Sequence, residues 1–238
     1  MRLTLDHSFT QLNPRFQRQR TPLRVVRLAM AFYQQGLSLR QVAQALRRLG
    51  HRVHHVTVWR WLQRCGSELE EQIWQGSLPE TIVVDETVLR TGWGKRWLYS
   101  ALDPQTRRVV FMRGYAQRTF LGTFDFFTEL IRTYRKSPQR VIVDGGPWYV
   151  WPLRRLGIER QVMRGGVRSH IERFFRYLKQ RLNGLDRYFP KAKSYRPLSN
   201  WLRLFAWYHN HVRKGVPAPS IPECNAAVDI ATPVSIFY

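Results

Sequence analysis

The chain has 238 residues, of which 44% are hydrophobic and 13% aromatic, so it can bury a sizeable core and is not globally disordered. Its 39 Lys and Arg residues against 16 Asp and Glu residues give a net charge of +23, which predicts a polyanionic partner such as nucleic acid. Two cysteines exclude a disulfide framework and a zinc site, and the lack of both a run of ~18 apolar residues and a signal-peptide core excludes a membrane or secreted protein.

Residues 22–78 are predicted to form a small helical domain with its linker, after a basic, flexible arm over residues 1–21. Apolar residues recur at helical spacing over residues 22–35, a capping-box pattern begins a second helix at Ser38, and a third helix is expected over residues 55–64. Short helices in this order, with glycine at the breaks, are typical of a helix-turn-helix.

The charge of this segment favours a role in DNA binding, because residues 1–66 contain twelve Arg and a single acid, Asp6. If Val58, Trp61 and Leu62 face the core, the other side of the third helix faces a DNA major groove. The residues predicted to contact DNA there are His54, His55, Thr57, Arg60 and Arg64. The alternatives are a helical bundle that binds protein, and a basic charge that reflects a ribosome-like protein or codon usage.

Residues 79–190 follow a different pattern, in which strands and helices alternate. Strands are expected at residues 81–85, 97–103, 108–115, 140–144 and 159–163, and helices at 121–134, 150–156 and 169–182. The first three strands should form an antiparallel meander. The order predicts an α/β fold of the ribonuclease H-like type, a mixed sheet flanked by helices. The remaining residues, 191–238, add an aromatic helix over 198–212 and a Pro-rich tail.

Three acids are the candidate catalytic residues. Asp85 and Asp144 each end an apolar strand, where a buried carboxylate is costly unless a cation offsets its desolvation. Glu172 is the single acid among eight basic side chains between residues 160 and 185, counting His170. In the expected fold the first and fourth strands are neighbours and the last helix covers their ends, so the three carboxylates should converge. Such a group suits two Mg²⁺ ions.

Two of these acids also have a purely structural interpretation. Asp144 precedes Gly145 and can serve the turn that follows its strand. Glu172 can neutralise Arg168 or Arg176, which lie one helical turn away.

The side chains around these acids have weaker assignments. Glu86 should point to the face of its strand opposite Asp85. Arg168, Arg176 and Lys179 are predicted to contact the DNA backbone, with solvated surface charge as the alternative. Four tryptophans are expected to pack in the core or on the surface, with stacking on unpaired bases as the alternative. They are Trp93, Trp97, Trp148 and Trp151.

These segments together resemble the insertion-sequence-six family of bacterial and archaeal transposases, over about residues 22–230. The matching motifs are Gly36-Leu-Ser-Leu-Arg-Gln-Val42, Val56-Thr-Val-Trp-Arg-Trp61, Val84-Asp-Glu-Thr87, Trp97 through Asp103, Asp144-Gly-Gly-Pro147 with Tyr149, and Ile171-Glu-Arg-Phe-Phe-Arg-Tyr-Leu-Lys179. The resemblance implies that Asp85, Asp144 and Glu172 are the acidic triad of a DDE enzyme. Gly145 departs from the pattern, since many members have Lys there, and the step from Asp144 to Glu172 is shorter than usual.

The resemblance implies a transposase that binds the terminal inverted repeats of an insertion sequence, cleaves DNA 3′ ends and transfers them to target DNA. The expected cofactor is Mg²⁺ or Mn²⁺, two ions per active site. The expected partners are double-stranded DNA, at element ends and target, and further copies of the chain, in a homodimer or larger assembly with contacts from the helix at 198–212. We expect a cytoplasmic, nucleoid-associated protein without membrane contact. The alternatives are a domesticated or regulatory DNA-binding protein and a ribonuclease H-like nuclease without strand transfer.

Overall fold

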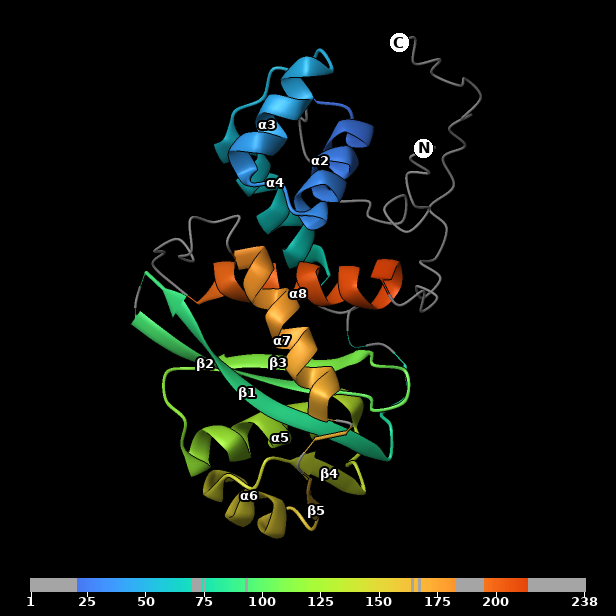
Figure 1. Ribbon diagram of the computed structural model, residues 1–238, viewed down its shortest axis with the longest axis vertical. Helices are drawn as coiled ribbons and strands as arrows, with labels where there is room; N and C mark the ends of the chain where they lie inside the picture. The colour runs from blue at the N-terminus through green and yellow to red at the C-terminus, as the bar shows by residue number, and fades with distance from the viewer. Residues whose placement is uncertain are drawn as a thin grey trace.

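A computed structural model describes residues 21–69, 74, 76–92, 94–163, 165–166, 168–182 and 195–213. A unit of three helices stands above a five-stranded sheet, and a long helix lies between the two (Figure 1). The helical unit consists of α2 (Leu23–Gln35), α3 (Leu39–Arg48) and α4 (His55–Glu68). The strands are β1 (Thr81–Thr91), β2 (Gly94–Leu102), β3 (Val109–Tyr115), β4 (Arg140–Val143) and β5 (Glu159–Val162). The helices of the second part are α5 (Phe120–Tyr134), α6 (Val150–Arg155) after a 3₁₀ turn (Pro147–Tyr149), α7 (Arg168–Leu182) and α8 (Arg196–Tyr208), which continues into a π-helical turn (His209–Arg213).

The helices of the helical unit begin close to the residues at which the sequence predicts them. The Oγ of Ser38 accepts a hydrogen bond from the backbone N–H of Gln41, whose side chain accepts one from the N–H of Ser38, so the predicted capping box is present. Gly36 ends α2 with a φ of 118°, a left-handed conformation that favours glycine. The third helix runs four residues beyond the predicted end, because Cys65 and Gly66 are buried.

The strand order in the sheet is β3-β2-β1-β4-β5. β1 is antiparallel to β2 and β2 to β3, whereas β1, β4 and β5 are parallel. The predicted meander and the predicted pairing of the first and fourth strands are therefore confirmed, and the fold is α/β of the ribonuclease H-like type.

The first two strands form a longer hairpin than predicted, since β2 begins at Gly94 rather than at residue 97. The sequence analysis ends the first strand at Asp85, but β1 continues to Thr91, so Asp85 lies in the interior of the longest strand. Residues 86–91 extend the strand because they form a hairpin with β2, in which Thr91 pairs with Gly94 and donates a hydrogen bond to its carbonyl. Gly94 has a φ of 101°, which fits it for the tight turn.

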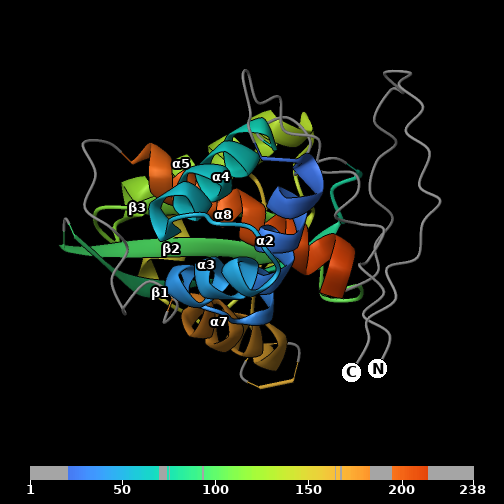
Figure 2. The ribbon, with the colours of Figure 1, turned by 90° about the horizontal axis from the view of Figure 1, so that it is seen from above.

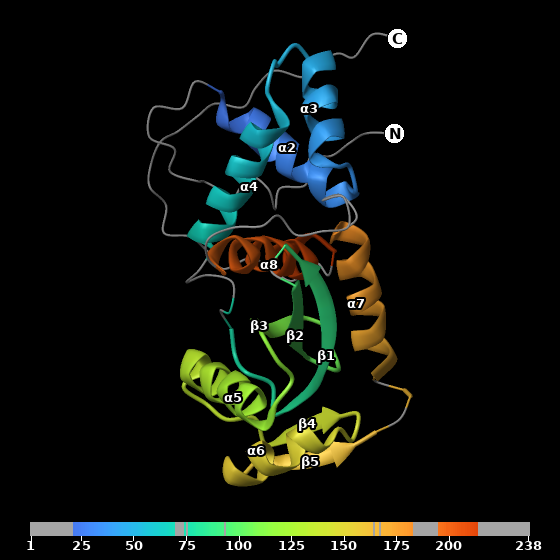
Figure 3. The ribbon, with the colours of Figure 1, turned by 90° about the vertical axis from the view of Figure 1, so that its left-hand side faces the viewer.

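Helices cover both faces of the sheet (Figure 3). α5 and α6 pack on one face, over a core that contains Ile82 and Val84 of β1. α7 and α8 pack on the other face, where the core contains Val83 and Leu89. Alternate side chains of β1 therefore point to different helices, as the pleat of a strand requires.

α8 joins the helical unit to the sheet, and it lies beneath the three helices when the molecule is seen from above (Figure 2). It crosses α4 so closely that a Cβ on Gly66 would lie 2.0 Å from the carbonyl oxygen of Asn200. Nine residues of α8 are buried within the chain. These side chains pack against both parts of their own chain, and the expectation that this helix also supplies contacts between copies of the chain stays a prediction.

Candidate functional site

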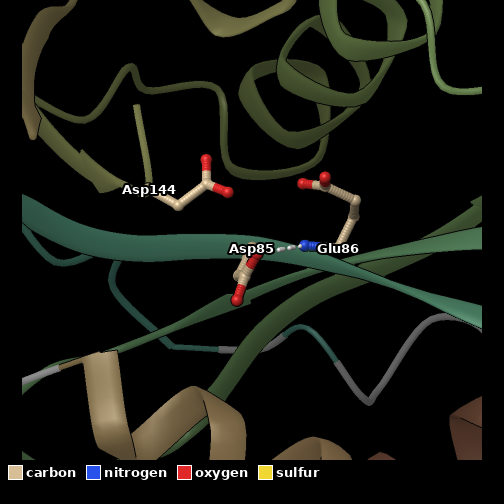
Figure 4. A group of neighbouring side chains, drawn as sticks. All are labelled: Asp85, Glu86 and Asp144. Atoms are coloured by element: carbon tan, nitrogen blue, oxygen red, sulfur yellow. Dashed lines mark hydrogen bonds between the residues drawn. The ribbon is translucent and has the colours of Figure 1, made fainter. Parts of the chain in front are cut away.

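Asp85 and Asp144 lie at the same level on neighbouring parallel strands. Val83 of β1 pairs with Ile142 of β4, and each acid follows its paired residue by two positions. One carboxylate oxygen each of Asp85, Asp144 and Glu86 lie within 4.8 Å of one another. We call these three side chains the acidic group (Figure 4).

Asp85 is buried, with 8% of the surface of the residue exposed. Its Oδ1 accepts a hydrogen bond of 2.8 Å from the backbone N–H of Glu86. By the alternation along β1, Asp85 shares its face with Val83 and Leu89, the face that α7 covers. Glu86 leaves the strand on the other side, as predicted, and Figure 4 shows it there together with Asp144.

Asp144 follows directly after β4 and also holds the turn behind it. Its Oδ1 accepts a hydrogen bond of 2.8 Å from the backbone N–H of Gly146. The turn is tight, because Gly145 has a φ of 88° and a Cβ on Gly146 would lie 2.3 Å from the ring of Trp148. The structural interpretation of Asp144 is thus correct, and it coexists with a place in the acidic group.

Glu86 is held by two partners from distant parts of the chain. Arg118 approaches its Oε1 at 3.2 Å, and the hydroxyl of Tyr149 donates a short hydrogen bond to its Oε2. The Glu86 side chain is only 3% exposed, against 35% for Arg118. Arg118 in turn lies between two indole rings, with its guanidinium carbon 4.3 Å from the ring centre of Trp97 and 3.8 Å from that of Trp148.

Burial raises the pKa of Tyr149 well above its ordinary value, and the negative charge of Glu86 raises it further. Tyr149 therefore stays protonated at neutral pH and can donate its hydrogen bond to Glu86. The sequence analysis missed Glu86 and Arg118 as site residues. An acid next to Asp85 in an acid-poor chain is a signal for Glu86, but Arg118 lies 32 residues further on and carries no such signal.

Glu172 does not belong to the acidic group, although it lies on the helix next to it. α7 contacts β1, and Ile171 is fully buried in the core on the face of the sheet that Asp85 shares. Glu172 follows Ile171 and is exposed, with Arg176 and Lys179 exposed further along α7. The side chain of Arg168 lies outside the described residues.

The predicted DNA-contacting residues lie at the surface of the helical unit. Val58, Trp61 and Leu62 are buried as predicted, and they turn the other face of α4 outward. On that face Arg60 and Arg64 are exposed and Thr57 is half-buried. Arg64 forms an ion pair with Glu68 at 3.4 Å.

The two histidines at the start of α4 have different roles. His54 caps the helix, since its Nδ1 accepts a hydrogen bond from the N–H of Val56. Partial desolvation lowers the pKa of His55, and the nearby His54 and Arg40 lower it further. His55 is therefore neutral at neutral pH and adds a hydrogen-bonding group rather than a charge to this surface.

The tryptophans near the site pack against protein groups. Trp97 and Trp148 enclose Arg118, and Trp151 lies 5.4 Å from the ring of Phe124. This agrees with the packing role favoured in the sequence analysis. Trp93 lies outside the described residues. Among the described residues, none of the helices is both long and apolar enough to cross a bilayer.

Comparison with known proteins agrees with this geometry. A family model described as a DDE domain matches residues 80–214, more than half of the chain. An uncharacterised protein of Methanocaldococcus jannaschii is 29% identical over 215 residues, covering 90% of this chain and 99% of that protein. The transposase for the insertion sequence-like element IS431mec of Staphylococcus aureus is 32% identical over 128 residues, covering 52% of this chain. The matched region spans 55% of the length of that transposase.

Among solved structures, the magnesium-bound catalytic core of HTLV-2 integrase in its dimeric form aligns with a TM-score of 0.45 and 20% identity, over 58% of this chain and 91% of that one. The matched DDE domain contains both strands that carry the acidic group as well as α7, and the transposases matched by sequence belong to insertion sequences. The chain therefore belongs to the DDE transposases of the insertion-sequence-six family.

Proposed function

We propose that the protein binds the terminal inverted repeats of an insertion sequence, cleaves the 3′ ends of the element and joins them to target DNA. The observation that carries this proposal is the acidic group, in which Asp85 and Asp144 meet on the two parallel strands of a DDE domain. Family membership supports DNA transposition in general, and the acids supply the chemistry.

The donor set of the site fits a divalent cation. Carboxylate oxygens are hard ligands of the kind that Mg²⁺ and Mn²⁺ prefer, and one oxygen of Asp85 and one of Asp144 lie within 4.8 Å of each other. Asp85 and Asp144 would hold the cation, and we propose Glu172 as the third acid and two ions per site. Cations bound there supply Lewis-acid activation of the attacking oxygen and stabilise the charge on the leaving 3′ oxygen.

The remaining residues position the acids and the DNA. Ile171 anchors α7 against the sheet, which keeps Glu172 at the edge of the face on which Asp85 lies. The exposed Arg176 and Lys179 continue from Glu172 along α7 and would contact the phosphate backbone, as would Arg168. Because the site contains acids rather than a nucleophilic side chain, water and a DNA 3′-hydroxyl can occupy the same attacking position.

The helical unit would read the ends of the element. α4 presents Arg60 and Thr57 near its start, with His54 and His55 beside them and Arg64 one turn further, and the N-terminal part of such a helix is the part that enters a major groove. Within its described residues, each chain has one such helix and one acidic group. Joining needs two DNA ends held together, so we propose a homodimer or a larger assembly on DNA.

The test uses labelled duplexes that carry the element's ends, intact or pre-nicked, with a target plasmid and Mg²⁺. We expect 3′-end cleavage and covalent joint products from the wild type. Asp85→Asn, Asp144→Asn and Glu172→Gln should each lower both activities to below about a tenth of wild type, because an amide keeps the shape but loses the charge that holds the cation. Asp125→Asn, an exposed acid on α5, is the matched control and should keep full activity.

The outcomes separate the alternatives. A triad variant with more than about a tenth of wild-type activity removes that residue from the site. Hydrolysis without joining favours a nuclease, and specific binding of the ends without cleavage favours a regulatory protein. Joint products formed by a strictly monomeric species, as judged by light scattering of the active complex, would contradict the proposed assembly.

A further inference from the structure

A second feature on the α7 face of the sheet is a pocket of about 190 Å³ with a cationic lining. Its polar walls are Arg107, Arg173, His170 and His209, and we call it the cationic pocket. Its volume equals several water molecules at about 30 Å³ each, which leaves room for a phosphodiester group. None of the acidic group lines it.

The pocket is built from elements that are fixed in place. His170, Arg173 and Tyr177 recur at the spacing of one helical face of α7. Arg107 lies in the β2–β3 turn, with a φ of 61° and its N–H donating to the carbonyl of Asp103. A ring nitrogen of His209, only 5% exposed, lies 3.2 Å from the carbonyl oxygen of Arg107 and ties the turn to the end of α8.

The two arginines of the pocket are not paired with acids within the described part of the chain. Neither Arg107 nor Arg173 forms an ion pair with a carboxylate among those residues. Arg173 donates a hydrogen bond to the Oγ of Ser169, which orients its guanidinium and leaves further N–H groups for another acceptor. Two guanidinium groups beside two imidazoles form a site for an anion with several oxygens.

The position of the pocket indicates which anion this is. Leu102 in its wall pairs with Val83, two residues before Asp85 on β1, and both belong to the core beneath α7. Two residues along a strand span about 7 Å and neighbouring strands lie ~4.8 Å apart. A DNA strand rises about 3.4 Å per nucleotide, so it spans the separation between Leu102 in the pocket wall and Asp85 within a few nucleotides. His170 and Arg173 also belong to the same turn of α7 as Glu172.

We propose that the cationic pocket binds one backbone phosphodiester of the DNA strand whose scissile phosphate lies at the acidic group. This rests on the proposed function, since it assumes that DNA is bound at the acids. The pocket would fix the register of the strand by holding a phosphate a few nucleotides from the cleavage point. Such a contact positions DNA without reading its sequence.

The experiment compares three full-length proteins on end duplexes that carry a single neutral methylphosphonate at successive positions around the cleavage site. The pocket variant is Arg107→Gln with Arg173→Gln. The matched control is Arg154→Gln with Arg155→Gln, which removes the same charge from exposed positions on α6, in the layer on the opposite face of the sheet. Affinity is measured by fluorescence anisotropy without divalent cation, so that the DNA stays intact, and thermal unfolding checks that each variant is folded.

For the wild type and the control, we expect one methylphosphonate position to weaken binding by about tenfold, the value of a lost charged contact. In the pocket variant the same position should cause no further loss, while the other positions keep their wild-type effects. The slope of log affinity against log salt should fall in the pocket variant by about 0.9, the value for one phosphate contact in duplex DNA.

Two results would overturn the proposal. If every methylphosphonate weakens the pocket variant as much as the wild type, the pocket does not contact the backbone. If inorganic phosphate at constant ionic strength raises the melting temperature of the wild type but not of the pocket variant, and no position is special, the pocket binds a free phosphate instead. If the wild type does not cleave the end duplexes in Mg²⁺, the proposed function is contradicted. The binding comparison would still show whether the pocket contacts a backbone phosphate.

Discussion

At the scale of single residues, the acidic group raises the question of which carboxylates hold the cation. At Asp85 and Asp144 the Oδ1 atom accepts a hydrogen bond from a backbone N–H group, and an ionised carboxylate has about four lone-pair sites, so such a bond is compatible with holding a cation. Both oxygens of Glu86 are occupied, one by Arg118 and the other by Tyr149. An oxygen that already balances an arginine is a poor ligand, so we infer that Glu86 positions the Asp144 turn through Tyr149 and is not itself a catalytic residue.

This assignment predicts a graded effect of Glu86→Gln. The amide still accepts a hydrogen bond from Tyr149 but leaves Arg118 unpaired, which should cost about 1–2 kcal/mol of unfolding free energy, less than a fully buried pair because Arg118 is partly exposed. Cleavage should need a several-fold higher Mg²⁺ concentration for half of its maximal rate, while the maximal rate itself stays close to wild type. A metal titration of the cleavage rate measures both quantities.

The same metal titration can contradict the assignment of Glu86 as a positioning residue. If no Mg²⁺ concentration restores cleavage to the Glu86→Gln protein, then Glu86 is a ligand and the assignment is wrong. Arg118→Gln provides the control, because it removes the same ion pair but no acid. If the ion pair is what matters, the double variant should be no worse than either single variant, whereas effects that add up would show that Glu86 and Arg118 act independently.

The residue-scale comparison shows what a sequence can and cannot specify. Asp85 and Asp144 could be predicted as neighbours because parallel strands bring their ends to one edge of a sheet. The partners of Glu86 could not, since 32 and 63 residues separate it from Arg118 and Tyr149 and no periodicity links them. The sequence could not predict which side of α7 faces the sheet. The packing of Ile171 decides this, and it thereby decides how far Glu172 lies from the strands.

At the scale of elements, α4 combines a buried face that holds it to the protein with an exposed face that we propose contacts DNA. Periodicity alone predicted both faces, since Val58 and Leu62 are buried and Arg60 is exposed. Its length was underestimated because the contact of Gly66 with α8 comes from the other end of the chain. The same limitation shortened the predicted first strand, whose second half depends on its hairpin with β2.

The two faces of α4 lead to a prediction about specificity. Arg60→Ala should weaken binding to the element's ends by about tenfold and leave binding to a scrambled duplex nearly unchanged, because a bidentate contact with a base is worth about 1–3 kcal/mol. Arg48→Ala, an exposed arginine in the last turn of α3, is the control and should lower both affinities by the same small factor. Anisotropy titrations at one fixed salt concentration compare them. Equal losses on both duplexes for Arg60→Ala would assign this residue to the backbone rather than to the bases.

At the scale of the whole molecule, the helical unit and the sheet share one apolar core. It includes Leu46 of α3, Trp201 of α8 and Leu89 of β1. Hydrogen bonds from α8 and the turn that follows it reach in both directions. Trp201 of α8 donates to the hydroxyl of Tyr33 on α2 at 2.8 Å. In the π-helical turn, the Asn210 side chain accepts from the backbone N–H of Val109 on β3 and donates to its carbonyl. The composition predicted enough apolar residues for such a core. The order of elements along the chain separates residues 22–78 from residues 79–190, and it cannot show that residues 195–213 lie between them.

A shared core predicts that the helices and the sheet unfold together. Leu46→Ala, at a fully buried position in α3, should cost about 2–5 kcal/mol and lower the melting temperature of the whole molecule in one transition. Val141→Ala on β4, buried in the core on the opposite face of the sheet, is the matched control and should shift the same single transition. Circular dichroism and tryptophan fluorescence should give coincident curves for each protein.

If Leu46→Ala instead produces an early transition that leaves a second one at the wild-type temperature, the helical unit is an independent domain. In that case the reading of DNA ends would be mechanically separable from the acidic group, whereas a single transition means that DNA bound at α4 acts on the same cooperative unit that holds Asp85 and Asp144.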